Sequence, residues 1–291
     1  MGSGSWTTSN YVTYTTTARG FKSMDDFTSS NVDTLYTQRE INQVLNPLNA
    51  NRECVDTEEH PNTIPVILAL DVTGSMGHTL ETISKQLNTI MENLYSSVKD
   101  IEFCVMAVGD LECDNAPIQM GQFESDIRIA EQLDKVYFER GGGGNAYESY
   151  SAAWYMGARH TKLDCWSRGK KGIIITMGDE PLNPCLPARR LSKVTGDSLQ
   201  GDIKTEDIYK EACEKFDIFH IGVNDNCSSF RYYAGSIRDS FKRVMGDHYL
   251  ECDCQNLPAT ISDIIEKRNN GFDEIKNSEP AYENSDEGIS W

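Results

Sequence analysis

One loop of the sequence carries three oxygen-bearing side chains at alternate positions. Asp71, Thr73 and Ser75 lie in the segment Asp-Val-Thr-Gly-Ser-Met, directly after the apolar run 64–70. A carboxylate and two hydroxyls spaced in this way converge when the loop turns into a helix, and Gly74 allows the tight turn. Such oxygen donors suit a hard cation such as Mg²⁺. The same residues also suit a strand end followed by Ser/Thr helix caps, so this loop alone does not establish a metal site.

Two further loops present polar side chains of a similar kind. The segment 141–149 opens with four glycines and places the oxygens of Asn145 and Glu148 before a predicted helix. No Gly-Lys-Ser/Thr follows the glycines, which argues against a phosphate-binding P-loop. The segment 177–181 contains Asp179 and follows another apolar run. Each loop alone is compatible with an ordinary surface turn, but ligands of parallel sheets bind at the carboxyl ends of the strands, so we expect all three loops at one edge.

The elements that must position these loops alternate between strands and helices over residues 61–269. Near-continuous apolar runs predict strands that are buried on both faces of a parallel sheet. The predicted strands are 64–70, 101–108, 118–123, 172–176, 217–223 and 248–251, and the predicted helices are 76–94, 124–133, 147–160, 205–216, 236–244 and 257–267. We therefore expect an α/β fold, a doubly wound and mostly parallel sheet of Rossmann-like type with helices on both faces.

The segments on either side of this domain have a different composition. Residues 1–60 form an N-terminal extension in which 14 of the first 34 residues are Ser or Thr. Without apolar periodicity it is predicted to be either a disordered leader or a strap on the main domain or on a partner. Residues 270–291 form an acidic C-terminal tail with six carboxylates and one lysine. We interpret the tail as solvated, with a docking peptide anchored by Phe272, Tyr282 and Trp291 as the alternative.

Charge and composition exclude several classes of function. The formal net charge of −18 and the pI near 4.6 argue against binding to nucleic acid or to an anionic membrane surface. No apolar run approaches the ~20 residues of a membrane span, and the N-terminus lacks the features of a secretion signal. The nine cysteines include the pair Cys252 and Cys254, but no second pair at zinc-like spacing, so we predict neither a structural zinc nor a disulfide framework. This usage favours the cytoplasm, or a virion assembled there.

Taken together, the three motifs resemble a known family. Asp-Val-Thr-Gly-Ser-Met after an apolar strand, a glycine-rich loop and the later turn Gly-Asp-Glu-Pro are similar to the von Willebrand factor A (vWA) domain over residues 61–269. The combination is most similar to intracellular vWA proteins of bacteria and phages. The resemblance implies a metal-ion-dependent adhesion site.

The resemblance assigns the ligands of this site residue by residue. Asp71, Thr73 and Ser75 match the first loop, with Thr73 in place of the usual serine, and Asp179 matches the acid of the third loop. The second loop departs from the family pattern, because Asn145 stands where a threonine or an aspartate is usual. Asn145 is expected to bind the cation through its amide oxygen or through a water molecule.

The implied function is that of a non-enzymatic protein-interaction module. A cation, Mg²⁺ or in its place Mn²⁺ or Ca²⁺, would bind an Asp or Glu carboxylate of a partner protein. Mg²⁺ keeps water ligands that an incoming carboxylate can displace, and the helix start after Ser75 favours an incoming anion. We expect a protein partner and no nucleic acid or membrane.

Three other functions are compatible with the sequence. The chain can be a structural scaffold component of a larger assembly, such as a phage particle, with its terminal segments as docking arms. It can be an adaptor to an AAA+ ATPase, by analogy with other intracellular vWA proteins. A serine hydrolase would use Ser75, Asp179 and His220, but Thr73 occupies the position at which a nucleophile elbow needs glycine.

Overall fold

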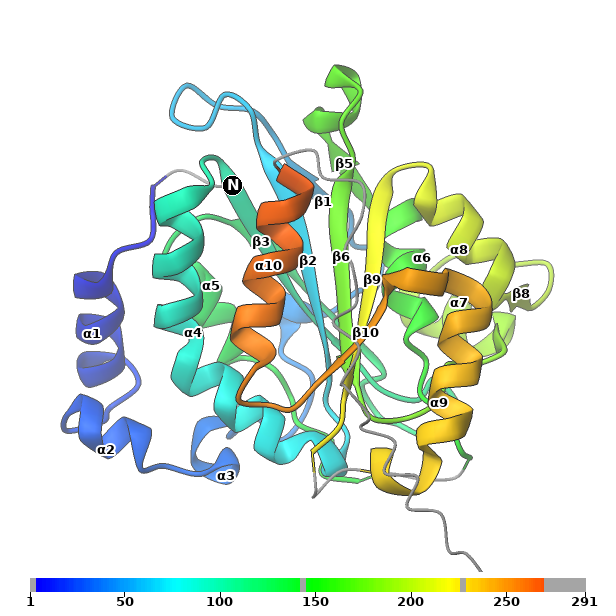
Figure 1. Cartoon of the computed structure of the whole chain (residues 1–291), viewed down its shortest axis with the longest axis horizontal. Coiled ribbons are helices and arrows are strands. Elements are labelled where there is room, and N and C mark those ends of the chain that lie inside the picture. Colours follow the sequence, from blue (N-terminus) through cyan, green and yellow to red (C-terminus); the bar gives the residue numbers. More distant parts are fainter. Residues whose placement is uncertain (1–3, 142–144, 226–228, 270–291) are drawn as a thin grey trace, which may run out of the picture.

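The computed structural model describes residues 4–141, 145–225 and 229–269 (Figure 1). The predicted acidic tail lies outside these residues. The strands are β1 (Arg52–Cys54), β2 (Ile64–Asp71), β3 (Ile101–Val108), β4 (Ile118–Glu124), β5 (Thr161–Leu163), β6 (Gly172–Gly178), β7 (Cys185–Leu186), β8 (Ile203–Lys204), β9 (Phe216–Val223) and β10 (Tyr249–Cys252). The α-helices are α1 (Thr8–Thr17), α2 (Met24–Thr28), α3 (Val32–Leu35), α4 (Gly77–Ser97), α5 (Arg128–Leu133), α6 (Ser151–Arg159), α7 (Ala188–Thr195), α8 (Thr205–Cys213), α9 (Phe230–Met245) and α10 (Leu257–Asn269). Short 3-10 turns are η1 (Gln43–Leu45), η2 (Gly74–Met76), η3 (Asp164–Arg168) and η4 (Gly246–His248).

A six-stranded sheet with the order β10-β9-β6-β2-β3-β4 forms the centre of the molecule. Every neighbouring pair is parallel except β3 with β4, which is antiparallel. The predicted α/β fold with a mostly parallel sheet is therefore confirmed. Because the chain runs in one direction through β2 and β6, the loops that follow these strands leave the sheet at the same edge.

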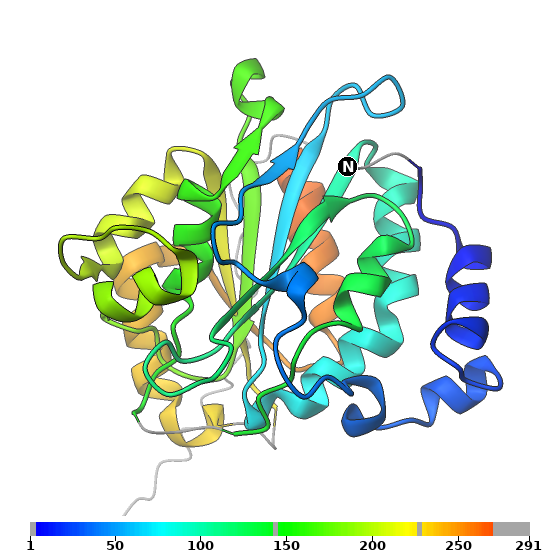
Figure 2. The ribbon, with the colours of Figure 1, turned by 180° about the vertical axis from the view of Figure 1, so that it is seen from behind.

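Helices cover both faces of the sheet, as predicted (Figures 1 and 2). Val66 and Leu68 of β2 belong to one apolar core, which α4, α5 and α10 complete. Ile67 and Ala69 alternate with them and belong to the opposite core, which α6, α7, α8 and α9 complete. Because both faces are buried, β2 must be apolar almost throughout, which is the feature that identified it in the sequence.

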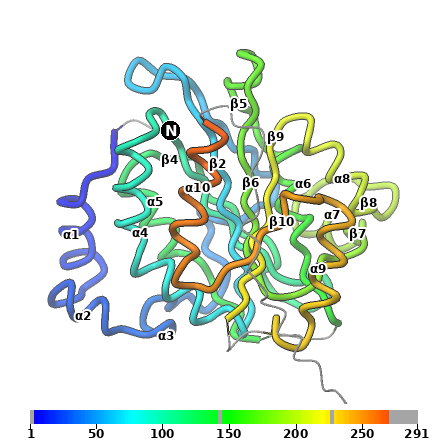
Figure 3. The backbone as a smooth tube through the Cα atoms, viewed as in Figure 1, coloured from blue at the N-terminus to red at the C-terminus, as the bar shows by residue number. Residues whose placement is uncertain are grey.

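The first part of the chain is folded and packs against α4, as the tube in Figure 3 shows. We call residues 4–50 the N-terminal strap. Tyr11 donates a hydrogen bond to the backbone oxygen of Ser84 at 3.1 Å, and Trp6 donates to Asn88 at 2.9 Å. Phe27 is wholly buried in the same core. Of the two alternatives for this segment, the described residues therefore form a strap on the main domain.

The Ser/Thr-rich composition of the strap has a structural use. The side chains of Thr7, Ser23 and Asn31 each accept a backbone N–H at the start of α1, α2 and α3. Such caps satisfy donors that a short helix leaves free, and packing supplies the rest of the stabilisation. Apolar periodicity alone did not predict α1, α2 and α3 in this region.

Several predicted boundaries were also wrong. α5 begins at Arg128 and α6 at Ser151, each four residues later than predicted, and α9 begins at Phe230, six residues earlier. Thr205 is the first residue of α8, and its hydroxyl donates to the backbone oxygen of Asn183 at 2.6 Å. α7 and the short strands β1, β5, β7 and β8 were not predicted. Among the described helices, none is both long and apolar enough to span a membrane.

Candidate metal centre

The first predicted loop contacts both of the others at the carboxyl edge of the sheet. The backbone N–H of Gly74 donates to the backbone oxygen of Gly141 at 2.7 Å, which joins the first loop to the second. The Ser75 hydroxyl donates to Asp179 Oδ1 at 2.9 Å, which joins the first loop to the third. The three loops thus meet at the carboxyl edge of the sheet, as we expected from the parallel order of its strands.

Asp71 is the last residue of β2 and is wholly buried. Its Oδ1 accepts two hydrogen bonds from Thr73, one from the backbone N–H at 2.9 Å and one from the hydroxyl at 2.6 Å. Its Oδ2 accepts a hydrogen bond from the Tyr150 hydroxyl at 2.7 Å. The carboxylate is therefore held in one orientation by the first loop and by the start of α6.

Asp179 follows β6 directly and is also wholly buried. Its Oδ1 accepts the Ser75 hydroxyl, and its Oδ2 accepts the backbone N–H of Ser229 at 2.7 Å. Asp71 with Thr73 and Asp179 with Ser75 thus form two acid–hydroxyl pairs. In each pair the hydroxyl proton is given to the carboxylate.

This arrangement prepares the two hydroxyl oxygens for a cation. A hydroxyl has one proton to donate and two lone pairs that can accept. Thr73 donates its hydroxyl proton to Asp71, and Ser75 donates its proton to Asp179. The lone pairs of both hydroxyl oxygens therefore stay available to a cation. Lone pairs on neutral oxygens are what a hard divalent cation binds.

The electrostatics of the pairs also favour a cation. Burial, and after it the neighbouring charge of Asp179, together raise the pKa of Asp71 to about 7. Burial raises the pKa of Asp179 as well. Two buried carboxylates that repel each other are stabilised by a positive charge. Within the described residues no Lys or Arg forms an ion pair with either, so the donor set fits a divalent cation.

Glu148 adds a third buried acid, and its backbone joins the second loop to the third. Its backbone N–H donates to the backbone oxygen of Pro181 at 3.1 Å. Burial, and then the charge of Asp71, raise the pKa of Glu148 well above its usual range. Its Oε2 is buried without a hydrogen-bond partner among the described residues.

Asn145, the fifth predicted ligand, is engaged elsewhere. Its Nδ2 donates to Asp110 Oδ2 at 2.8 Å, and its Oδ1 accepts the backbone N–H of Tyr147 at 3.3 Å. The other four predicted ligands form two hydrogen-bonded pairs, Asp71 with Thr73 and Asp179 with Ser75, and the first loop carries both hydroxyls. In the part of the chain that is described, no hydrogen bond joins Asn145 to these four.

Two supporting groups were missed by sequence reasoning. Tyr150 orients Asp71 and the backbone of Ser229 orients Asp179. Gly178 makes room for Tyr150, because a Cβ at this position would overlap the tyrosine hydroxyl. Neither group was predictable, because no local sequence motif marks a tyrosine at a helix start or a backbone N–H as part of a site. The glycine immediately before Asp179 was the one available signal, and it had no assigned role.

The residues of the hydrolase alternative are arranged differently from a catalytic triad. His220 lies inside β9, wholly buried, and its Nδ1 is 2.9 Å from the Thr176 hydroxyl. Burial lowers the pKa of His220 well below its usual value. The Ser75 hydroxyl donates to Asp179 instead. Among the described hydrogen bonds none links Ser75 to His220.

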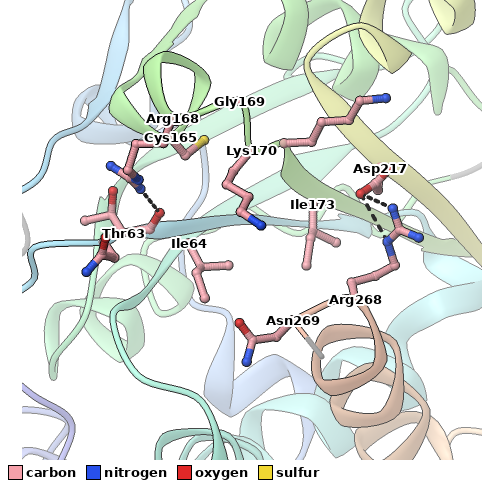
Figure 4. Close-up of a pocket in the computed structure, with 12 residues that line it drawn as sticks. Thr63, Ile64, Cys165, Arg168, Gly169, Lys170, Ile173, Asp217, Arg268 and Asn269 are labelled. Carbon is pink, nitrogen blue, oxygen red and sulfur yellow. Dashed lines mark hydrogen bonds and ion pairs between the residues drawn. The ribbon is translucent and has the colours of Figure 1, made fainter. Parts of the chain in front are cut away.

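A cavity of about 480 Å³ lies away from the acid–hydroxyl pairs. Ile64 and Ile173, near the starts of β2 and β6, line it, whereas Asp71 and Asp179 follow the opposite ends of these strands. Figure 4 shows Lys170 reaching into it, and Arg268 paired with Asp217 at its side. The cavity is therefore separate from the candidate metal centre.

Comparisons with known proteins gave distant likenesses of fold only. No family model and no curated protein matches the chain. The pilus adhesin SpaC from Lactobacillus rhamnosus GG, in its open conformation, is similar with a TM-score of 0.46 and 12% identity, over 76% of this chain and 31% of the adhesin. The chain thus spans less than a third of that protein.

Two shorter structures are similar over nearly their whole length. The vWF domain of the type V pili tip protein Mfa5 from Porphyromonas gingivalis has a TM-score of 0.47 and 11% identity, over 74% of this chain and 97% of that domain. The conserved hypothetical protein BatB from Bacteroides thetaiotaomicron has a TM-score of 0.45 and 17% identity, over 71% and 99%. At these scores the likenesses do not assign the chain to a family.

Proposed function

We propose that this chain is a non-enzymatic protein-interaction module that uses a divalent cation to bind an acidic group of a partner protein. The observation that carries the proposal is the pair of acid–hydroxyl contacts, Asp71 with Thr73 and Asp179 with Ser75. The resemblance of the three loops to the vWA metal site supports it. The setting that we propose, cytoplasmic or virion-associated, rests on the composition of the sequence.

Each residue has a distinct task in this proposal. Asp71 and Asp179 balance the charge of the cation, Mg²⁺ or in its place Mn²⁺ or Ca²⁺. Thr73 and Ser75 supply neutral oxygen ligands. Asn145 would contribute through its amide oxygen or through a water molecule, after exchanging its hydrogen bond with Asp110. When bound, the cation supplies coordination positions that water or a partner carboxylate can fill.

The surface beside the centre suits a protein partner. Tyr232 is 83% exposed and lies three residues after Ser229, the residue whose backbone holds Asp179. Exposed tyrosines are frequent energetic centres of protein interfaces. We therefore infer that Tyr232 contacts the partner whose carboxylate reaches the cation. Replacing Tyr232 with Ala should weaken partner binding and leave cation binding unchanged.

The experiment that tests this function measures peptide binding with and without Mg²⁺. An array of peptides, each with one Asp or Glu, is paired with copies that carry Asn or Gln instead. We expect a subset to bind the full chain only when both Mg²⁺ and the carboxylate are present. Binding should be lost in Asp179→Asn and retained in Asp247→Asn, a control in η4. Binding that is equal with and without Mg²⁺ would contradict the proposal.

A second candidate, a scaffold component of a larger assembly, is favoured by the outer surface of the strap. Val12, Val44 and Leu48 are 37%, 47% and 50% exposed, and within the described ranges they are the exposed large aliphatic residues. Single exposed apolar residues are common, but three in one segment suit a contact between chains. Light scattering of the full chain tests this, with Val44→Glu and Leu48→Glu as disrupting changes.

A further inference from the structure

Three side chains that belong to no predicted site lie together at the carboxyl edge of the sheet. His78 is in the first turn of α4, Asp225 lies two residues beyond β9, and Cys254 lies two residues beyond β10. One donor atom of each lies within 4.8 Å of the donor atoms of the other two. We propose that His78, Asp225 and Cys254 form a zinc site, separate from the acid–hydroxyl pairs.

The donor set selects the metal. A thiolate, an imidazole and a carboxylate are typical zinc ligands, whereas Mg²⁺ binds oxygen almost exclusively. The thiolate and the carboxylate balance the two charges of Zn²⁺. Zinc–ligand bonds of about 2.0–2.3 Å place ligand atoms roughly 3.5 Å apart, so small side-chain rotations bring the three atoms into range. Three protein ligands leave a fourth position for water or for a group of another molecule.

The two loops that carry Asp225 and Cys254 are already joined. The backbone N–H of Cys254 donates to Asp225 Oδ1 at 3.0 Å, and the backbone N–H of Asn224 donates to the backbone oxygen of Cys252 at 3.0 Å. Cys254 is buried and His78 is exposed. Asp225 and Cys254 are thus held in place on the inner side of the site. His78 lies at the surface, where an ion can enter.

The spacing of these residues explains why sequence reasoning did not predict the site. Cys252 and Cys254 are close in the sequence, but no second pair of Cys or His at zinc-like spacing accompanies them. The fold instead joins Cys254 to residues that are far away along the chain. Parallel strands make this possible, because their successive loops return to one edge of the sheet.

Zinc binding to the full chain tests the proposal. The protein is stripped with a chelator and kept in a phosphine reductant, and Zn²⁺ is titrated in excess Mg²⁺. We expect one high-affinity zinc per chain. Cys254→Ser should weaken it by more than about 100-fold, beyond the usual cost of losing a residue that merely supports a ligand. Cys252→Ser is the matched control and should bind zinc as the wild type does.

Two further variants separate the possible outcomes. His78→Ala changes an exposed side chain, so it should fold normally and still lose zinc affinity, even if Cys254→Ser is unstable. Asp71→Asn should keep zinc while it loses Mg²⁺, so that the two sites fail independently. With Co²⁺ as a probe, the thiolate charge-transfer absorption should disappear in Cys254→Ser and persist in Cys252→Ser. Absence of zinc binding in the wild type, or equal affinity in His78→Ala, would overturn the proposal.

Discussion

Thr73 shows how much of the proposed chemistry depends on a single hydroxyl. Its proton is donated to Asp71 and its lone pairs remain for a cation. Thr73→Ser keeps the hydroxyl, so it should bind Mg²⁺ almost as the wild type does. Thr73→Val keeps the shape and removes the oxygen, so we expect an affinity loss of about tenfold or more and a stability cost of about 1–3 kcal/mol from the unsatisfied carboxylate. Calorimetric titration and urea unfolding measure the two effects, and equal Mg²⁺ affinity in both variants would contradict the ligand role.

We expect a different residue, Glu102 in β3, to make stability depend on pH. It is buried, its Oε1 has no hydrogen-bond partner among the described residues, and burial raises its pKa from 4.5 to about 7. Because the unfolded chain loses its proton first, the free energy of unfolding falls as the pH rises from 4.5 towards 7. The total loss in the free energy of unfolding is about 1.4 kcal/mol for each unit by which folding raises the pKa of Glu102.

Glu102→Gln tests this linkage, because the amide does not ionise. We expect the variant to be more stable than the wild type at about pH 8 and to differ little at about pH 4. Urea unfolding at both values is the measurement, with Glu53→Gln, a half-exposed residue of β1, as the control. A difference between wild type and Glu102→Gln that does not change with pH would show that Glu102 titrates normally.

The sequence predicted the site residues whose positions are determined by residues close to them along the chain. Asp71, Thr73 and Ser75 share one loop, so their spacing alone indicated that they converge. Asp179 needed one further premise, that β2 and β6 are parallel. The placement of Tyr150 beside Asp71, and the grouping of His78, Asp225 and Cys254, depend on contacts between distant segments, which no local spacing encodes.

At the scale of elements, the contact between β6 and α6 determines the orientation of Asp71. Gly178 at the end of β6 lies against the Tyr150 hydroxyl, which donates to Asp71. Gly178→Ala adds a Cβ that overlaps this hydroxyl, so Tyr150 must move. We expect a loss of about 1–3 kcal/mol in the free energy of unfolding and a lower affinity for Mg²⁺.

Gly201→Ala is the matched control for this change, because a Cβ at that position meets nothing within 4 Å. Thermal unfolding with and without Mg²⁺ measures both variants. If Gly178→Ala behaved like Gly201→Ala, the packing of Tyr150 would not control the centre.

Elements were predicted well where burial on both faces required apolar runs. β3 was predicted with its observed bounds because all eight of its residues are buried. Helix starts were less accurate, since α6 begins at Ser151 after residues that also fit a helical pattern. α1, α2 and α3 were missed because their stability comes from capping and from packing on α4, which local periodicity does not report.

At the scale of the molecule, the N-terminal strap is part of the main core. Phe27 is wholly buried beside Tyr11 and Phe21. Phe27→Ala should therefore lower the free energy of unfolding of the whole chain by about 3–5 kcal/mol. We expect a single transition with the same midpoint by far-ultraviolet circular dichroism and by tryptophan fluorescence.

Val12→Ala in α1 is the control, and an exposed position of this kind should change stability by no more than about 0.5 kcal/mol. Two separate transitions in Phe27→Ala would show that the strap folds independently. The strap contacts also mean that truncating the extension would disturb the fold, so surface substitutions are the sounder test of assembly.

The central claim is that Asp71, Thr73, Ser75 and Asp179 bind a divalent cation. The most direct measurement is calorimetric titration of Mg²⁺ and Mn²⁺ into the cation-free full chain, beside Asp71→Ala and the zinc-site variant Cys254→Ser. The account predicts one site in the wild type and in Cys254→Ser, and none in Asp71→Ala with its fold retained. Equal binding by the wild type and Asp71→Ala, or no binding by the wild type, would contradict it.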